Sequence, residues 1–121
     1  TGSFPEEIFG MPKLKQLNVS GNSLTGSIPD TIGNFGSGLA SRQRKYLNLA
    51  NNRFSGTVPP EVANITDLKE LTLHNNSFKG TMPDTVCSLE TGAGSKSFRL
   101  TMLTSDCKEV DCSCSAVCQC F

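Results

Sequence analysis

Hydrophobic and polar residues alternate along this chain in a pattern that recurs. Three copies, at 17–29, 47–59 and 71–83, share L-x-(L/V)-x-x-N-x-(L/F)-x-G-(S/T)-x-P, and a truncated copy opens the chain at 1–5. Self-similarity at a period of roughly 20–50 residues indicates a solenoid, in which each repeat forms one coil. Recurrence therefore predicts the architecture before the conformational preference of any single residue is considered.

Each unit contains the same predicted elements in the same order. The alternation at 17–19, 47–49 and 71–73 has the period of a half-buried strand. Because every coil runs the same way round, we expect these short strands to stack in parallel. The Gly-(S/T)-x-Pro segment then turns the chain out of the sheet. A stretch such as 60–65 is expected to form a short helix or 3₁₀ turn on the back.

The repeat length is regular except at two insertions. Units 1–24 and 55–78 each span 24 residues, whereas 25–54 spans 30. The extra residues fall near 35–44, where Gly and Ser are frequent, and a second polar insert follows at 91–97. Gly- and Ser-rich composition predicts loops. The insertions should leave the strands and their turns intact.

One asparagine occupies the same place in three units. These residues are Asn22, Asn52 and Asn76. A carboxamide carries two donors and an acceptor, so at a sharp turn it can pair backbone groups of its own coil and of the next. We expect a structural ladder of asparagines rather than ligand contacts.

The repeats resemble the plant-type leucine-rich repeat, L-x-x-L-x-x-L-x-L-x-x-N-x-L-(T/S)-G-x-(I/V)-P, over about residues 1–83. The resemblance implies an α/β solenoid, a right-handed coil with short parallel strands on the concave face and a second, smaller sheet near the T-G-x-I-P segment. Similar domains serve as receptor ectodomains and inhibitor proteins in plants. Short secreted proteins of algae such as diatoms, with cysteine-rich tails, are also similar.

The chain departs from the family pattern at two places. It has no amino-terminal cysteine cap, and its first coil lacks a strand, so one edge of the core would be bare. This suggests missing upstream residues or another subunit that packs against the uncapped coil. The leucine eight residues before the Asn is kept as Leu14 and Leu68 but becomes Arg44 in the expanded unit.

The last coil has an ambiguous register. Its residues can be aligned with Phe98, Thr101 and Leu103 inward and Asp106 in the Asn position, and a shifted register puts Cys107 there. We predict repeats over 1–106 and a cysteine-rich cap over 107–121. Terminal repeats need such a cap to cover their apolar face.

Six cysteines are concentrated at the carboxyl end. They are Cys87, Cys107, Cys112, Cys114, Cys118 and Cys120. An even cluster favours disulfides in an oxidising compartment, and six cysteines allow 15 pairings. One bridge between Cys87 and the Cys107 region would staple the last coil. Zinc held by four thiolates is the alternative, although structural zinc sites more often space their pairs as C-x₂₋₄-C. We predict no metal.

Charge and hydropathy exclude several function classes. Eleven basic and eleven acidic residues balance, so no charge excess favours nucleic acid. The local basic cluster of Arg42, Arg44 and Lys45 is expected to be a solvated loop. No apolar run reaches the roughly 18 residues of a membrane span, so we predict no direct membrane insertion. Glycosylation sequons at Asn18, Asn64 and Asn75 are consistent with a secreted or lumenal glycoprotein.

The outward residues of the strands form the candidate binding surface. By strand alternation these are Gln16, Asn18, Ser20, Tyr46, Asn48, Glu70, Thr72 and His74. Tyrosine is a good recognition anchor, because it offers rigid apolar area with a polar tip. Each residue could equally be part of an ordinary solvated strand face. A glycan on Asn18 would sit within this face and count against recognition there.

Two functions remain open. The first is an extracellular recognition module that binds a protein, peptide or glycan through the concave sheet. The second is a structural or assembly subunit that docks into a larger complex through its ends, inserts or cysteine-rich tail. No nucleophile, phosphate-loop or zincin motif accompanies the lone His74, so we expect neither an enzyme nor a cofactor.

Overall fold

A computed structural model of the chain describes residues 2–3, 7, 13–36, 44–65, 68–87, 100–112 and 118–120. Its elements, in chain order, are β1 (Gly2–Ser3), β2 (Gln16–Asn18), β3 (Leu24–Gly26), η2 (Asp30–Asn34), β4 (Lys45–Asn48), β5 (Arg53–Gly56), η3 (Pro60–Asn64), β6 (Leu68–Thr72), β7 (Ser77–Phe78), β8 (Gly80–Thr81), α1 (Asp84–Cys87), β9 (Met102–Ser105), β10 (Val110–Asp111) and β11 (Cys118–Cys120). The elements labelled η are 3₁₀ helices.

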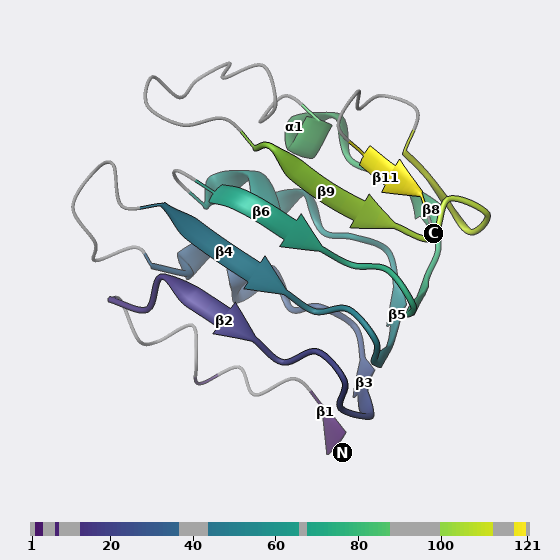
Figure 1. The fold of residues 1–121 in the computed structure, drawn as a ribbon, viewed down its shortest axis with the longest axis horizontal. Coiled ribbons are helices and arrows are strands. Elements are labelled where there is room, and N and C mark those ends of the chain that lie inside the picture. Colours follow the sequence, from purple (N-terminus) through teal and green to yellow (C-terminus); the bar gives the residue numbers. More distant parts are fainter. Residues whose placement is uncertain are drawn as a thin grey trace.

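In the described part of the chain the main sheet has five strands, all parallel, in the order β11-β9-β6-β4-β2. Figure 1 shows the sheet as a row of arrows that climbs from β2 to β11. The leucines of the repeats pair across the sheet in register, Leu17 with Leu47 and Leu47 with Leu71. Stacked coils that all turn the same way produce this parallel pairing.

Short segments at or just before the repeat glycines form the second, smaller sheet structure. β1, β3, β5 and β7 pair in parallel, and β10 pairs with β8 beside them. The first coil therefore contributes β1 to this smaller sheet. Gly26, Gly56 and Gly80 have φ of 88°, 81° and 91°, values that residues with a Cβ rarely adopt.

Short helices cover the back of the main sheet. η2, η3 and α1 pack against one another in sequence behind the strands. η2 and η3 begin directly after Pro29 and Pro59, whose carbonyls accept hydrogen bonds from the N–H groups of Ile32 and Val62. The proline therefore ends the strand path and starts the helical turn.

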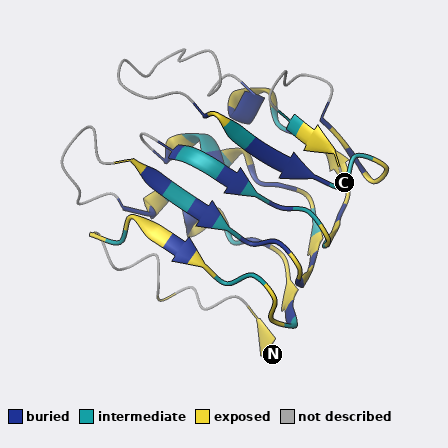
Figure 2. Ribbon diagram, in the orientation of Figure 1, coloured by how far each residue is buried: buried dark blue, intermediate teal, exposed yellow. Residues whose placement is uncertain are grey.

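The core is a continuous strip between the sheet and the helices. Each coil adds the same apolar positions to it, and Figure 2 shows buried and intermediate residues together in β4 and β6, whereas β9 is mostly buried. Phe54 and Phe78 occupy equivalent positions in successive coils, and their rings stack at 6.2 Å between centroids. Packing between neighbouring coils is what stabilises a repeat that cannot bury its apolar side alone.

The expanded repeat differs from the prediction. Arg44 does not take the leucine position, because β4 and β6 change register between Lys45 and Tyr46 and bring Lys45 opposite Leu68. Lys45 is only 1% exposed, whereas Arg44 is exposed. The prediction of a solvated cluster is therefore wrong for Lys45, while Arg42 lies outside the described residues. A bulge lets a long aliphatic stem fill the space of a leucine.

The last coil also differs from the predicted register. Leu103 pairs with Leu71, the first leucine of the alternating pair, and Thr101 is exposed rather than inward. The spacing from Leu100 to Leu103 repeats that from Leu68 to Leu71, and all four residues are buried. Burial of this L-x-x-L pair sets the register. Neither predicted alignment of the Asn position is correct, and Phe98 lies outside the described residues.

Asp106 nevertheless caps a turn of the preceding coil. Its two carboxylate oxygens accept hydrogen bonds from the backbone N–H groups of Asn75 (2.8 Å) and Asn76 (3.0 Å). Charge-assisted bonds of this kind are stronger than bonds between neutral groups. Asp106 therefore joins the last described coil to the repeat before it.

Within the described residues, two disulfides hold the carboxyl-terminal cap. Cys107 is bonded to Cys120, and Cys112 to Cys118. Cys107 itself is therefore not the partner of Cys87 in the predicted bridge between Cys87 and the Cys107 region, although Cys87 is disulfide-bonded. The cap continues both sheets, because β10 pairs with β8 and β11 pairs with β9. Strand pairing and cross-links together cover the last coil.

Candidate functional site

The concave sheet carries a groove of about 230 Å³. Its lining residues are Gln16, Leu17, Asn18, Tyr46, Leu47, Asn48, Glu70, Thr72 and Met102. Six of the predicted surface residues are thus brought together, while Ser20 and His74 are not among the lining. Met102 was not predicted. The correct register of β9, which pairs Met102 with Glu70, would have placed Met102 on this face.

The parallel register arranges these side chains in two rows across the strands. One row runs through Gln16, Tyr46, Glu70 and Met102, and the other through Asn18, Asn48, Thr72 and Thr104. Neighbouring strands lie about 4.8 Å apart and residues two positions apart on a strand about 6.6 Å apart. The rows therefore form a regular grid of side chains, of which all but Met102 are polar.

The side-chain oxygens of Asn18, Asn48 and Thr72 in the second row already make hydrogen bonds. Asn18 Oδ1 accepts hydrogen bonds from the Ser20 N–H (3.0 Å) and hydroxyl (2.6 Å), and Asn48 Oδ1 accepts one from the Ala50 N–H (3.1 Å). Thr72 Oγ1 donates to the Leu47 carbonyl at 3.4 Å. These local bonds hold the side chains in fixed orientations on the sheet.

His74 is tied to the last described coil instead. Its Nδ1 lies 2.8 Å from Oγ1 of Thr104, a hydroxyl that also accepts the Leu73 N–H at 3.1 Å. Because the Leu73 N–H can only donate, the Thr104 hydroxyl hydrogen remains available for Nδ1. Thr104 is 2% exposed and His74 is half-buried, so this contact is partly shielded from solvent. The arrangement joins the coils of β6 and β9.

The asparagines Asn52 and Asn76, which occupy the same position in successive repeats, make hydrogen bonds between coils. Asn52 Oδ1 accepts the Leu24 N–H at 3.1 Å, and Asn76 Oδ1 accepts the Phe54 N–H at 3.0 Å. Their Nδ2 groups donate to carbonyls of their own and the preceding coil, including Val19 for Asn52 at 2.9 Å. Asn22 is exposed, and its Nδ2 donates to the carbonyls of Val19 and Ser20 within its own turn.

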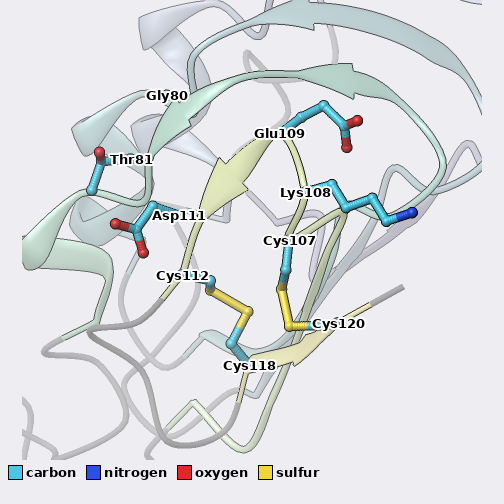
Figure 3. A pocket seen from close by; sticks show the side chains of 9 residues that line it. All are labelled: Gly80, Thr81, Cys107, Lys108, Glu109, Asp111, Cys112, Cys118 and Cys120. Atoms are coloured by element: carbon cyan, nitrogen blue, oxygen red, sulfur yellow. A yellow bond between two sulfur atoms is a disulfide. The ribbon is translucent and has the colours of Figure 1, made fainter.

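The cap contains a second, wider hollow of about 640 Å³. Its lining residues are Gly80, Thr81, Cys107, Lys108, Glu109, Asp111, Cys112, Cys118 and Cys120. Figure 3 shows the two disulfides side by side, with the Lys108 and Glu109 side chains beyond them. The sulfurs of these four cysteines are bonded in pairs, so they are not available as the thiolates that zinc requires.

The three sequons lie at different places on the fold. Asn18 lines the groove, and Asn64 is exposed at the end of η3 on the back of the sheet. Asn75 is exposed at a turn with φ of 56°, and its Nδ2 donates to Asn51 Oδ1 at 2.8 Å. A glycan would therefore have a different consequence at each site.

Comparison with known proteins identifies the class. The family model described as Leucine Rich Repeat matches residues 13–35, 45–65 and 67–89, which is more than half of the chain. The chain belongs to the leucine-rich repeat family. No curated protein sequence matches it. Among the described helices, none is long and apolar enough to cross a membrane.

Solved plant structures share the fold. A chain in the crystal structure of the Arabidopsis receptor kinase HAESA, in complex with the peptide hormone IDA and the co-receptor SERK1, is 32% identical with a TM-score of 0.64, covering 86% of this chain and 15% of that one. A chain of the BIR3–SERK2 complex from Arabidopsis thaliana is 25% identical with a TM-score of 0.68, covering 86% and 49%. A TDR receptor, 23% identical with a TM-score of 0.69 and coverage of 87% and 16%, shares the fold. The chain spans less than half the length of each.

Proposed function

We propose that this protein is an extracellular recognition module whose concave sheet binds a protein or peptide partner. The observation that carries the proposal is the groove over β2, β4 and β6, which gathers six outward polar residues in register. The paired cysteines support an oxidising compartment. The HAESA structure, a complex with a peptide hormone and a co-receptor, supports a polypeptide partner.

The chemistry of the groove also supports binding. Among the residues that the structure describes, no hydrogen bond or ion pair engages the side chains of Gln16, Tyr46 or Glu70. An amide, a phenol and a carboxylate on a rigid sheet can each bond to a ligand without first breaking an internal bond. Sites on rigid elements lose little conformational entropy on binding.

Assembly through the cap and the edges is the second candidate. It is favoured by the hollow around the two disulfides, and by β2, which is the last strand of the main sheet in the described residues and pairs there with β4. An edge strand presents backbone groups to which another chain can pair. Under this proposal a neighbouring subunit packs against the first coil.

Site-specific photo-cross-linking distinguishes the two. A photoreactive amino acid is placed at Gln16 in the groove, at Thr31 on η2, or at Glu109 in the cap, all of which are exposed. Incubation with native source material and mass analysis then identify the linked chain. Concave recognition predicts links from Gln16 that disappear when Asn48→Trp fills the groove and persist with Thr31→Trp. Cross-links from Glu109 alone would favour assembly. Cross-links from Gln16 to a glycan would show that the concave sheet binds a glycan rather than a protein or peptide.

A further inference from the structure

The amide groups of Asn18 and Asn48 have a fixed polarity. A backbone N–H can only donate, so the contacts from Ser20 and Ala50 require the oxygen of each carboxamide to face its own chain. Neither Nδ2 group has a hydrogen-bond partner in the part of the chain that the structure describes. Because Asn18 and Asn48 are directly paired in register, the groove holds two N–H₂ donors on neighbouring strands, which lie about 4.8 Å apart.

Glu70 lies in the other row of the groove. It pairs in register with Tyr46 on one side and with Met102 on the other, and all three residues are half-buried. Glu70 is the charged member of the lining, and within the described residues no ion pair or hydrogen bond compensates its carboxylate. A carboxylate between an aromatic ring and a thioether suits an organic cation, because the ring face also attracts positive charge.

We propose that the groove binds an extended peptide segment that carries a Lys or Arg side chain. The basic group pairs with Glu70, its aliphatic stem lies against Tyr46 and Met102, and a backbone carbonyl accepts from the donors of Asn18 and Asn48. The two rows are about 6.6 Å apart, a distance that a long basic side chain spans. This inference rests on the proposed function, since it specifies the ligand of the concave sheet.

Other ligand classes fit this chemistry less well. A neutral glycan could accept from Asn18 and Asn48, but it would cover Glu70 without neutralising it, and covering an unpaired charge is costly. An acidic peptide would be repelled by Glu70. A glycan attached to Asn18 would convert one donor group into a covalent linkage. The binding form is therefore the one in which Asn18 is unmodified.

The test is an NMR titration with defined probes. The protein has intact disulfides and an intact mass that shows no glycan on Asn18. The probes are acetyl-Ala-Lys-Ala-amide, the same peptide with norleucine or Glu in place of Lys, and the neutral oligosaccharide cellotetraose. The readout is the side-chain N–H₂ resonances of Asn18 and Asn48, together with the dissociation constant. We expect the lysine probe to shift both resonances and to bind about five- to tenfold more tightly than the norleucine probe.

Two variants separate the charge from the fold. Glu70→Gln should lower the affinity for the lysine probe to that for norleucine, whereas Glu109→Gln, an exposed carboxylate of the cap, should leave it unchanged. Equal binding of the lysine and norleucine probes overturns the inference. The inference is also overturned if only cellotetraose shifts the two resonances. It is overturned as well if none of the probes shifts them at concentrations up to about 10 mM.

The proposed function fails by a different result. If the probes show no preference for lysine but Asn48→Trp still abolishes the cross-link from Gln16, concave recognition stands and only the basic ligand is wrong. If Asn48→Trp leaves the native cross-link intact, concave recognition itself is wrong. The two outcomes come from separate measurements, so neither can be mistaken for the other.

Discussion

Gly36 packs directly against the buried stem of Lys45. A Cβ at Gly36 would lie 2.8 Å from Cδ of Lys45 and 2.9 Å from the carbonyl oxygen of Leu14, and its φ is 66°. We therefore expect Gly36→Ala to lower the free energy of unfolding by about 2–4 kcal/mol, from backbone strain plus overpacking. Urea unfolding followed by circular dichroism measures this loss.

Gly21 is the matched control for this substitution. Its φ is 72°, but nothing lies within 4 Å of the position that a Cβ would take. Gly21→Ala should therefore cost only the strain of the left-handed conformation, about 1 kcal/mol. Equal costs at the two glycines would show that Lys45 does not occupy the space beside Gly36.

Asn52 and Asn22 should differ in their contribution to stability. Asn52→Ala removes bonds to the Leu24 N–H and the Val19 carbonyl of the preceding coil, and Asn52 is 9% exposed. Buried polar groups left unpaired cost about 1–3 kcal/mol each, so we expect a loss of about 2–4 kcal/mol. Asn22→Ala affects only bonds within an exposed turn and should cost under about 1 kcal/mol. Similar losses in chemical denaturation would contradict the role of Asn52 between coils.

The repeat architecture was predictable because one physical pattern occurs three times. The alternating leucines place the strands, and the spaced Gly and Pro place the turns between them. The burial of Lys45 was not predictable from the sequence. A bulge puts Lys45, rather than its neighbour Arg44, at the buried position, and a shift of one residue is not visible in the repeat spacing. Register in an irregular coil is decided by packing rather than by local sequence.

The groove was predictable only where the repeats are regular. Strand alternation correctly places Tyr46 and Glu70 side by side on one face. Met102 was missed because the last coil was aligned on its alternating residues rather than on Leu100 and Leu103. The orientation of the Asn48 carboxamide also could not be predicted from the sequence, since it depends on a hydrogen bond from the backbone N–H of Ala50.

Asp106 should stabilise the turn of the preceding coil through both oxygens. Asp106→Asn retains one acceptor oxygen, so one of the bonds from Asn75 and Asn76 is lost and the other is no longer charge-assisted. We expect a loss of about 1–2 kcal/mol in the free energy of unfolding. Glu109→Gln, which changes an exposed carboxylate nearby, is the control and should be nearly neutral. An unchanged midpoint for Asp106→Asn in urea unfolding would contradict this role.

The disulfide between Cys107 and Cys120 should stabilise the edge of the main sheet. It closes a separation of 13 residues, for which loop entropy predicts about 3 kcal/mol. The double variant Cys107→Ser/Cys120→Ser should lose that amount and show faster amide exchange in β11. Peptide mapping without reduction should recover Cys107–Cys120, Cys112–Cys118 and a third bridge that holds Cys87. A bridge from Cys87 to Cys107 would contradict this pairing.

Glycosylation should affect binding according to the face that carries it. A glycan on Asn18 would fill the groove, whereas one on Asn64 would lie on the back of the sheet, where that residue is exposed. We expect Asn64→Gln to leave the cross-link from Gln16 unchanged. Protein fractions that carry a glycan on Asn18 should lose the cross-link completely, because Nδ2 is both the donor in the groove and the atom to which the glycan is attached. Intact-mass analysis of the cross-linked and unlinked fractions measures occupancy at each site. Full occupancy of Asn18 in the cross-linked fraction would be incompatible with concave recognition and would favour assembly through the cap.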